Sequence, residues 1–218
     1  MCYFRKEQPL LKNYGNRPGE LFIVSGPSGV GKGTICKEVL KTESTVQLSV
    51  SATTREPREG EVHGVNYFFL SKEEFTERIE NNEFLEYAEV FGNFYGTPIK
   101  PVEEKLNSGI DVLLEIDVQG AIRVKKNYPE GIFIFVLPPT LAELRRRLTN
   151  RGTDSPEVIE ERLSKAMGEI KQMFEYDYFV VNDDLEEAVA TTKAIILAEH
   201  HRVKDHGLEL LRILEEEE

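Results

Sequence analysis

The sequence predicts an α/β fold in which helices cover both faces of a parallel sheet, and two patterns support this prediction. Short apolar runs alternate with segments of helical periodicity along most of the 218 residues, and this alternation is typical of a buried parallel sheet. The first apolar run also ends at a glycine-rich turn that opens directly into a helix. The predicted sheet has five strands, at residues 21–24, 46–51, 111–117, 132–137 and 179–181.

The glycine-rich turn after the first strand has the spacing of a phosphate-binding loop. Residues 26–32 read GPSGVGK, which fits the pattern G-x-x-x-x-G-K. Glycines allow backbone N–H groups to face a common centre, and the N-terminus of the following helix adds positive potential there. A tight strand-to-helix turn with a surface lysine is the alternative. The candidate phosphate-binding residues, which the family resemblance described below assigns to ATP, are Gly26, Pro27, Ser28, Gly29, Val30, Gly31, Lys32, Gly33 and Thr34.

This loop departs from the common pattern at one position. A serine or threonine usually follows the lysine and contacts Mg²⁺, but this chain has Gly33 there, with Thr34 one place later. Because glycine has no hydroxyl, we expect the metal to be held through water at this point rather than by the side chain of residue 33.

A small mixed lobe of short strands and one helix is expected at residues 52–98. Its first loop carries Arg55 and Arg58, and the lobe also contains Tyr67 and Tyr95. Arginine forks bind phosphate bidentately, and tyrosine hydroxyls add neutral donors. These residues are therefore candidate phosphate ligands, although a solvated loop beside core tyrosines would give the same spacing.

Acidic side chains lie where they could face a ligand. Glu115 and Asp117 end a buried strand and are two residues apart, so they share one face of the sheet. Acids in this position beside a phosphate loop typically serve magnesium or substrate. Glu86 lies on the predicted hairpin of the lobe, where a carboxylate could accept hydrogen bonds from guanine N–H groups or could face solvent. Ser51 and Asn182 also fall at the carboxyl ends of strands, where ligands bind in such sheets.

A basic segment resembles a mobile lid. Arg147 and Arg151 are four residues apart on one helix, Gly152 follows, and Arg162 lies on the next helix, which Pro156 begins. A glycine-hinged segment bearing several arginines could clamp phosphate. A basic surface helix is the alternative.

Composition restricts the classes of function. The formal net charge of −12 argues against a general nucleic-acid binder, and no run approaches the roughly 18 apolar residues of a membrane span. The first residues lack the apolar core of a signal peptide, so we expect a cytoplasmic protein. Cys2 and Cys36 form no disulfide framework, and we expect Cys36 to be buried on the first helix. Neither His200 nor His201 has metal-ligand spacing to a cysteine, and both are expected to face solvent.

Taken together, residues 20–200 resemble the guanylate kinase family. Besides the phosphate loop, which marks only the P-loop nucleoside monophosphate kinase superfamily, a long family-specific signature matches at residues 51–61 and 64–69. Further segments match in the same order, at residues 82–88, 92–97, 115–120, 147–152 and 182–184. Gly33, where many members have serine, and Glu115, where aspartate is frequent, are departures that affect the surroundings of magnesium.

The resemblance implies an ATP:GMP phosphotransferase that uses Mg²⁺ and has a P-loop NTPase-type three-layer fold with a GMP-binding insertion and a helical lid. It implies that guanine is read by Ser51, Glu86, Thr97 and Asp117 and that the GMP phosphate is held by Arg55, Arg58, Tyr67 and Tyr95. The transferring group would be surrounded by Lys32, Arg147, Arg151 and Arg162, with Asn182 beside adenine and Glu115 toward the metal. Two rival functions stay open, namely a kinase for another nucleoside monophosphate and a catalytically inactive interaction module of the same fold.

We expect one kinase-like domain with flanking segments, and the residues suggest no particular oligomeric state. The expected parts are a lead-in at 1–19, a core at 20–51, 99–146 and 163–205, a GMP-binding lobe at 52–98, a lid at 147–162 and an acidic tail at 206–218.

Overall fold

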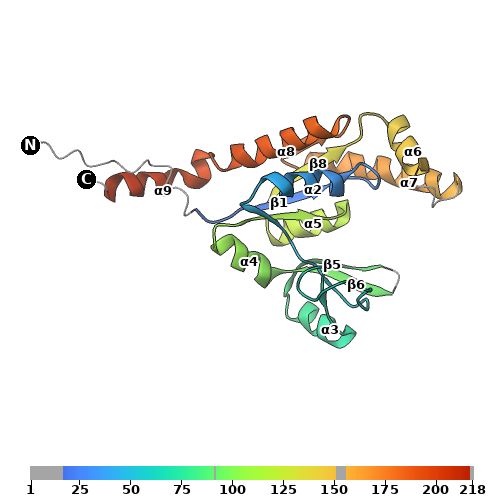
Figure 1. Cartoon of the computed structure of the whole chain (residues 1–218), viewed down its shortest axis with the longest axis horizontal. Helices are drawn as coiled ribbons and strands as arrows, with labels where there is room; N and C mark the ends of the chain where they lie inside the picture. The colour runs from blue at the N-terminus through green and yellow to red at the C-terminus, as the bar shows by residue number, and fades with distance from the viewer. Residues whose placement is uncertain (1–16, 91, 151–155, 217–218) are drawn as a thin grey trace, which may run out of the picture.

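A computed structural model describes residues 17–90, 92–150 and 156–216, and its core is a parallel five-stranded sheet (Figure 1). The strand order is β2-β7-β1-β8-β9, with every neighbouring pair parallel. The predicted α/β class with a five-stranded parallel sheet is therefore confirmed. The strands are β1 (Leu21–Ser25), β2 (Val46–Leu48), β7 (Asp111–Glu115), β8 (Ile132–Leu137) and β9 (Tyr178–Val181).

Helices cover both faces of this sheet, which explains why the central strands are apolar throughout. Phe22 and Ile23 of β1 are both fully buried, and they belong to separate core clusters on opposite faces. One face packs against α2 (Lys32–Thr42), α6 (Leu141–Asn150), α7 (Pro156–Ile170) and α8 (Leu185–Glu199). The other face packs against α4 (Ile99–Asn107) and α5 (Val118–Asn127).

A second, smaller sheet extends from one side of the core, below α5 and beside α4 in Figure 1. Its strand order is β4-β3-β6-β5, and α3 covers it with Phe75 stacked between Phe84 and Phe94. Ser71 and Glu74 form a capping box at the start of α3. The elements are β3 (Ala52–Thr53), β4 (Phe68–Phe69), α3 (Lys72–Glu80), β5 (Phe84–Val90) and β6 (Asn93–Pro98).

Several elements differ from the prediction. Strand β7 ends at Glu115 rather than at residue 117, so Asp117 is the N-cap of α5 and does not share a sheet face with Glu115. Strand β2 ends at Leu48 rather than at residue 51, because Ala52 and Thr53 pair with β4 and β6 of the second sheet. A 3₁₀ helix, η2 (Lys171–Glu175), joins α7 to β9. The segment expected as an acidic tail from residue 206 is helical, since α9 spans Val203–Glu216 and extends beyond the core (Figure 1). Leucines 208, 211 and 214 recur along α9 with helical spacing, a pattern that the acidic composition of the segment obscured.

None of the helices that the structure describes is both long enough and apolar enough to span a bilayer. Cys36 is buried on α2 as predicted, and burial raises the pKa of its thiol to about 12.

Candidate functional site

The loop between β1 and α2 has the backbone geometry of an anion cradle. Gly26, Gly29 and Gly31 have φ angles of 144°, 91° and 93°, which side-chain-bearing residues rarely adopt. Gly31 is the N-cap of α2, and a Cβ atom there would lie 2.4 Å from the Asn182 amide nitrogen. Lys32 Nζ donates to the carbonyls of Gly26 and Pro27, at 2.7 and 3.2 Å. The ammonium group therefore already lies across the mouth of the cradle.

Two residues from distant elements hold this loop in place. The Asn182 side chain is buried and donates through Nδ2 to the Val30 carbonyl at 2.7 Å. Arg147 of α6 donates to the Asn182 carbonyl at 2.9 Å and to Glu143 at 2.7 Å. In this structure both residues therefore support the loop backbone, a role that the sequence did not suggest because the contacts join segments more than 30 positions apart.

A group of carboxylates surrounds Lys32. Burial lowers the pKa of its ammonium group, while Glu115, Glu169 and Asp117 oppose that shift. Glu115 is the last residue of β7 and lies beside Val24 of β1, immediately below the loop. The sequence did not predict Glu169 of α7 as a member of this group, because it lies more than 50 positions after Glu115 and Asp117 in the chain. Carboxylate oxygens are the ligands that Mg²⁺ prefers, so the donor set at this edge fits that ion.

Arg55 is the centre of the predicted phosphate site in the lobe. Its guanidinium lies over the rings of Tyr67 and Phe69, and the rings of Tyr67 and Tyr95 meet edge to face. One guanidinium nitrogen donates to both carboxylate oxygens of Glu61 at 2.9 Å. The structure thus brings together three of the four predicted phosphate ligands, Arg55, Tyr67 and Tyr95. The carboxylate of Glu61 occupies the guanidinium of Arg55 in this structure.

Glu86 and Asp117 converge on the first turn of α5. Glu86 Oε1 accepts from the hydroxyl of Thr97 at 2.9 Å, and Asp117 Oδ1 accepts from the Gly120 amide at 2.7 Å. A Cβ atom on Gly120 would lie 3.4 Å from an oxygen of each carboxylate. Burial raises the pKa of Glu86, and the charge of Asp117 adds to that rise. The pair is therefore a compact acceptor site for N–H donors.

Arg123 is a further residue of this region that the sequence did not reveal. It lies one turn after Gly120 on α5 and lines a cavity of about 170 Å³ together with Glu86, Tyr87 and Asn127. Its charge opposes the rise in the pKa of Glu86. Its Nε atom is buried without a hydrogen-bond partner among the described residues. A basic residue in the middle of an amphipathic helix carries no sequence signal for such a contact.

The remaining predicted residues occupy less defined positions. Ser51 is half-buried directly before β3. Arg58 is exposed, and its backbone amide donates to the Glu61 carboxylate that pairs with Arg55. Arg162 is half-buried on α7. Arg151 lies outside the residues that the structure describes.

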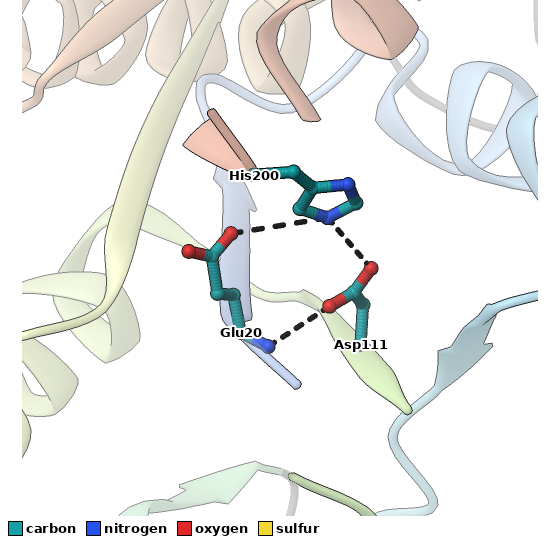
Figure 2. A group of neighbouring side chains, drawn as sticks. All are labelled: Glu20, Asp111 and His200. Carbon is teal, nitrogen blue, oxygen red and sulfur yellow. Dashed lines mark hydrogen bonds and ion pairs between the residues drawn. The ribbon is translucent and has the colours of Figure 1, made fainter. Parts of the chain in front are cut away.

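A second cluster of titratable groups lies at the opposite, N-terminal end of the strands. Glu20 and Asp111 flank His200, the C-cap residue of α8, and the three side chains point toward one another (Figure 2). His200 Nε2 lies 2.9 Å from Asp111 Oδ2 and 3.9 Å from Glu20 Oε2. The expectation that His200 faces solvent is therefore wrong, because the end of α8 packs against the sheet and its imidazole also contacts the ring of Phe22. His201 is exposed, as expected.

The spacing of these three ligand atoms would suit a metal ion, but Arg17 occupies the position that a cation would need. Its guanidinium nitrogen lies 3.0 Å from both oxygens of Asp111 and contacts His200 Nε2. Burial alone would raise the pKa of Asp111, but hydrogen bonds from His200 and the Glu20 amide, together with Arg17, hold it below its ordinary value. The cluster is an ion-pair network that ties α8 and residue 17 to the sheet.

The fold and the site together define a P-loop kinase with a separate lobe for a phosphorylated acceptor. Comparison with known proteins identifies the family within this class. The chain belongs to the guanylate kinase family, which matches residues 19–199. It is 53% identical over 201 residues to the guanylate kinase of Clostridioides difficile, an alignment that covers 92% of this chain and 98% of that protein. It is 56% identical over 182 residues to the guanylate kinase of Halalkalibacterium halodurans, covering 84% and 89% of the two chains.

A solved structure agrees with this assignment. The crystal structure of guanylate kinase from Anaplasma phagocytophilum superposes with a TM-score of 0.68 at 37% identity, over 90% of this chain and 95% of that one. The resemblance predicted from the sequence motifs is therefore confirmed.

Proposed function

We propose that the chain transfers the γ-phosphoryl group of ATP to GMP, giving ADP and GDP, with the phosphate loop holding ATP and the lobe holding GMP. Family membership with identities above 50% supports the reaction. One observation carries the assignment of the two sites. The end of β7 contacts both sites: the carboxylate of Glu115 lies against Gly33 of the phosphate loop, and two residues later Asp117 lies beside Gly120 of α5, which Glu86 also approaches.

The acceptor needs little chemical activation. A phosphate monoester has a second pKa of about 6, so GMP arrives largely as a dianion and its phosphate oxygen is already nucleophilic. That oxygen forms a bond to the γ-phosphorus while the bond from the γ-phosphorus to the bridging oxygen of ADP breaks. No side-chain base is required for this step.

The residues of the chain act by positioning and by charge. In this proposal Arg55, Arg58, Tyr67 and Tyr95 hold the phosphate of GMP, and Arg55 exchanges Glu61 for that phosphate when GMP binds. Lys32, Arg147, Arg151 and Arg162 oppose the repulsion between the two anionic substrates. Closure of the lobe and of the lid at 147–162 would exclude water.

Recognition of the base falls to the acceptors beside α5. In this proposal Glu86 and Asp117 accept from the N–H groups of guanine, and Ser51 and Thr97 also contact the base. Asn182 lies toward adenine and holds the loop. Glu115 would hold Mg²⁺, which supplies charge neutralisation of the phosphates when bound. A cytoplasmic location belongs to the proposal, and the buried free thiol of Cys36 suits a reducing compartment.

A coupled assay of ADP release, run with GMP, AMP, CMP and UMP in turn, tests this function. Activity with GMP alone supports the proposal, and equal activity with another monophosphate would favour a different kinase. Absence of GDP formation with every substrate present would favour the interaction module, which the presence of Lys32, Arg55 and Arg58 argues against.

A further inference from the structure

Gly33, at the end of the phosphate loop, has no side chain, and the long side chain of Glu115 from β7 lies opposite it. Gly33 occupies the position after the loop lysine, where serine or threonine would normally supply a hydroxyl to the metal. A Cβ atom on Gly33 would lie 3.2 and 3.3 Å from the two carboxylate oxygens of Glu115. The end of the Glu115 side chain therefore lies against the space that a serine at residue 33 would enter.

The backbone gives no reason for glycine at residue 33. The residue lies in the first turn of α2, and its φ angle lies outside the left-handed region that favours glycine. Serine is well tolerated at the start of a helix. The side chain of Glu115 is thus the neighbour that a side chain at residue 33 would meet first.

The charge of the Glu115 carboxylate also acts along the same turn of α2, in agreement with its position beside Gly33. After burial, its charge is the largest contribution to the raised pKa of Cys36, three positions after Gly33. It is also the largest of the carboxylate contributions to the environment of Lys32. Glu115 consequently reaches from the end of β7 to the first turn of α2, which an aspartate with one fewer methylene group would not do equally well.

We propose that Gly33 and Glu115 form a reciprocal pair. The absent side chain at residue 33 leaves room for the long carboxylate at residue 115, and that carboxylate supplies the oxygen that a hydroxyl at residue 33 would otherwise offer to the metal. This inference deepens the proposed use of ATP with Mg²⁺ and rests on it. It replaces the expectation of a purely water-mediated contact at this point with a direct carboxylate ligand.

A double-mutant cycle tests the pair. Wild type, Gly33→Ser, Glu115→Asp and the double variant are titrated with Mn²⁺ in the presence of ADP, and free Mn²⁺ is followed by electron paramagnetic resonance. Each single variant should bind Mn²⁺ about 10-fold more weakly, the lower end of the range for a disturbed metal environment. The double variant should recover most of the wild-type affinity, because the hydroxyl and the shorter carboxylate now fit together. A double variant whose loss equals the product of the two single losses would overturn the proposal.

Thermal unfolding of the four metal-free proteins separates folding from ligation. The melting temperatures report whether each variant is folded, and Gly33→Ala adds the Cβ atom without a hydroxyl. If crowding acts as inferred, Gly33→Ala should lower the melting temperature less in the Glu115→Asp variant than in the wild-type protein. A loss of Mn²⁺ affinity in Thr34→Ala with none in Glu115→Asp would assign the ligand to the threonine hydroxyl and overturn the proposal. Because these measurements omit GMP, failure of wild type to bind Mn²⁺ and ADP would count against the proposed function instead.

Discussion

Replacement of Glu86 by glutamine should change stability and GMP binding in opposite directions. Glutamine keeps an oxygen that can accept from Thr97, whose hydroxyl lies 2.9 Å from Oε1. The substitution replaces Oε2, which lies beside Gly120, with an NH₂ group, and this group cannot accept a hydrogen bond from the N–H donors of guanine. Loss of one hydrogen bond to a charged group costs about 1.5–3 kcal/mol, so the KM for GMP should rise about 10- to 150-fold while the KM for ATP is unchanged.

In the absence of GMP, the same substitution should increase thermal stability. Burial and the charge of Asp117 raise the pKa of Glu86 in the folded state. Between the ordinary glutamate pKa and this raised value, the folded state binds more protons than the unfolded state, so stability falls as the pH rises through that window and then levels off. Glutamine removes the buried charge, so Glu86→Gln should melt at a higher temperature than wild type at pH 7.5, and the difference should shrink as the pH falls.

Steady-state kinetics with GMP and IMP, together with thermal unfolding at pH 4.5–8, measure both effects. IMP lacks the exocyclic amine of guanine, so the preference of the enzyme for GMP over IMP should also fall in the variant. Lys126→Ala is a matched control, since Lys126 is exposed on α5 and lines the same cavity as Glu86. A variant with a lower melting temperature and an unchanged KM for GMP would refute the placement of Glu86 against the base.

Three further predictions concern residues in other parts of the structure. Arg58→Ala should raise the KM for GMP far more than the KM for ATP, and equal increases in the two constants would place Arg58 outside the acceptor site. Arg123→Gln should raise the KM for GMP without changing the KM for ATP, because it removes the charge beside Glu86; Arg123→Lys should restore most of the affinity, and no rescue would indicate a packing role instead. Asp111→Asn should lower the free energy of unfolding at pH 7 by about 3–5 kcal/mol, because Arg17 would lose its buried partner. Since the pKa of Asp111 is lowered by folding, this contribution to stability is present above the ordinary aspartate pKa and is lost as the pH falls below it. Chemical denaturation at pH 7 and pH 3 measures the free energy of unfolding of both proteins. An equal loss of stability in the variant at both pH values would contradict the ion-pair explanation.

Local patterns were enough to predict the elements whose causes lie within a few residues. The phosphate loop depends on glycines at fixed spacing between Gly26 and Gly31, and the start of α3 depends on the Ser71 capping box. The central strands are buried on both faces, so their apolar runs identify them without knowledge of their neighbours. The family signatures are contiguous stretches of sequence, so they can be recognised without knowledge of the tertiary structure.

The contacts that complete the site join residues that are far apart in the sequence, and only the tertiary structure decides them. Asn182 reaches Val30 across 152 positions, and Arg17 reaches Asp111 across 94. Glu169 and Arg123 lie on amphipathic helices, whose periodicity distinguishes the buried face from the exposed one but does not say which strand or loop lies opposite. The space between Gly33 and Glu115 likewise exists only because β7 lies beside β1 in the sheet. The amino-acid pattern thus determined which elements form, and the packing of those elements determined which side chains meet.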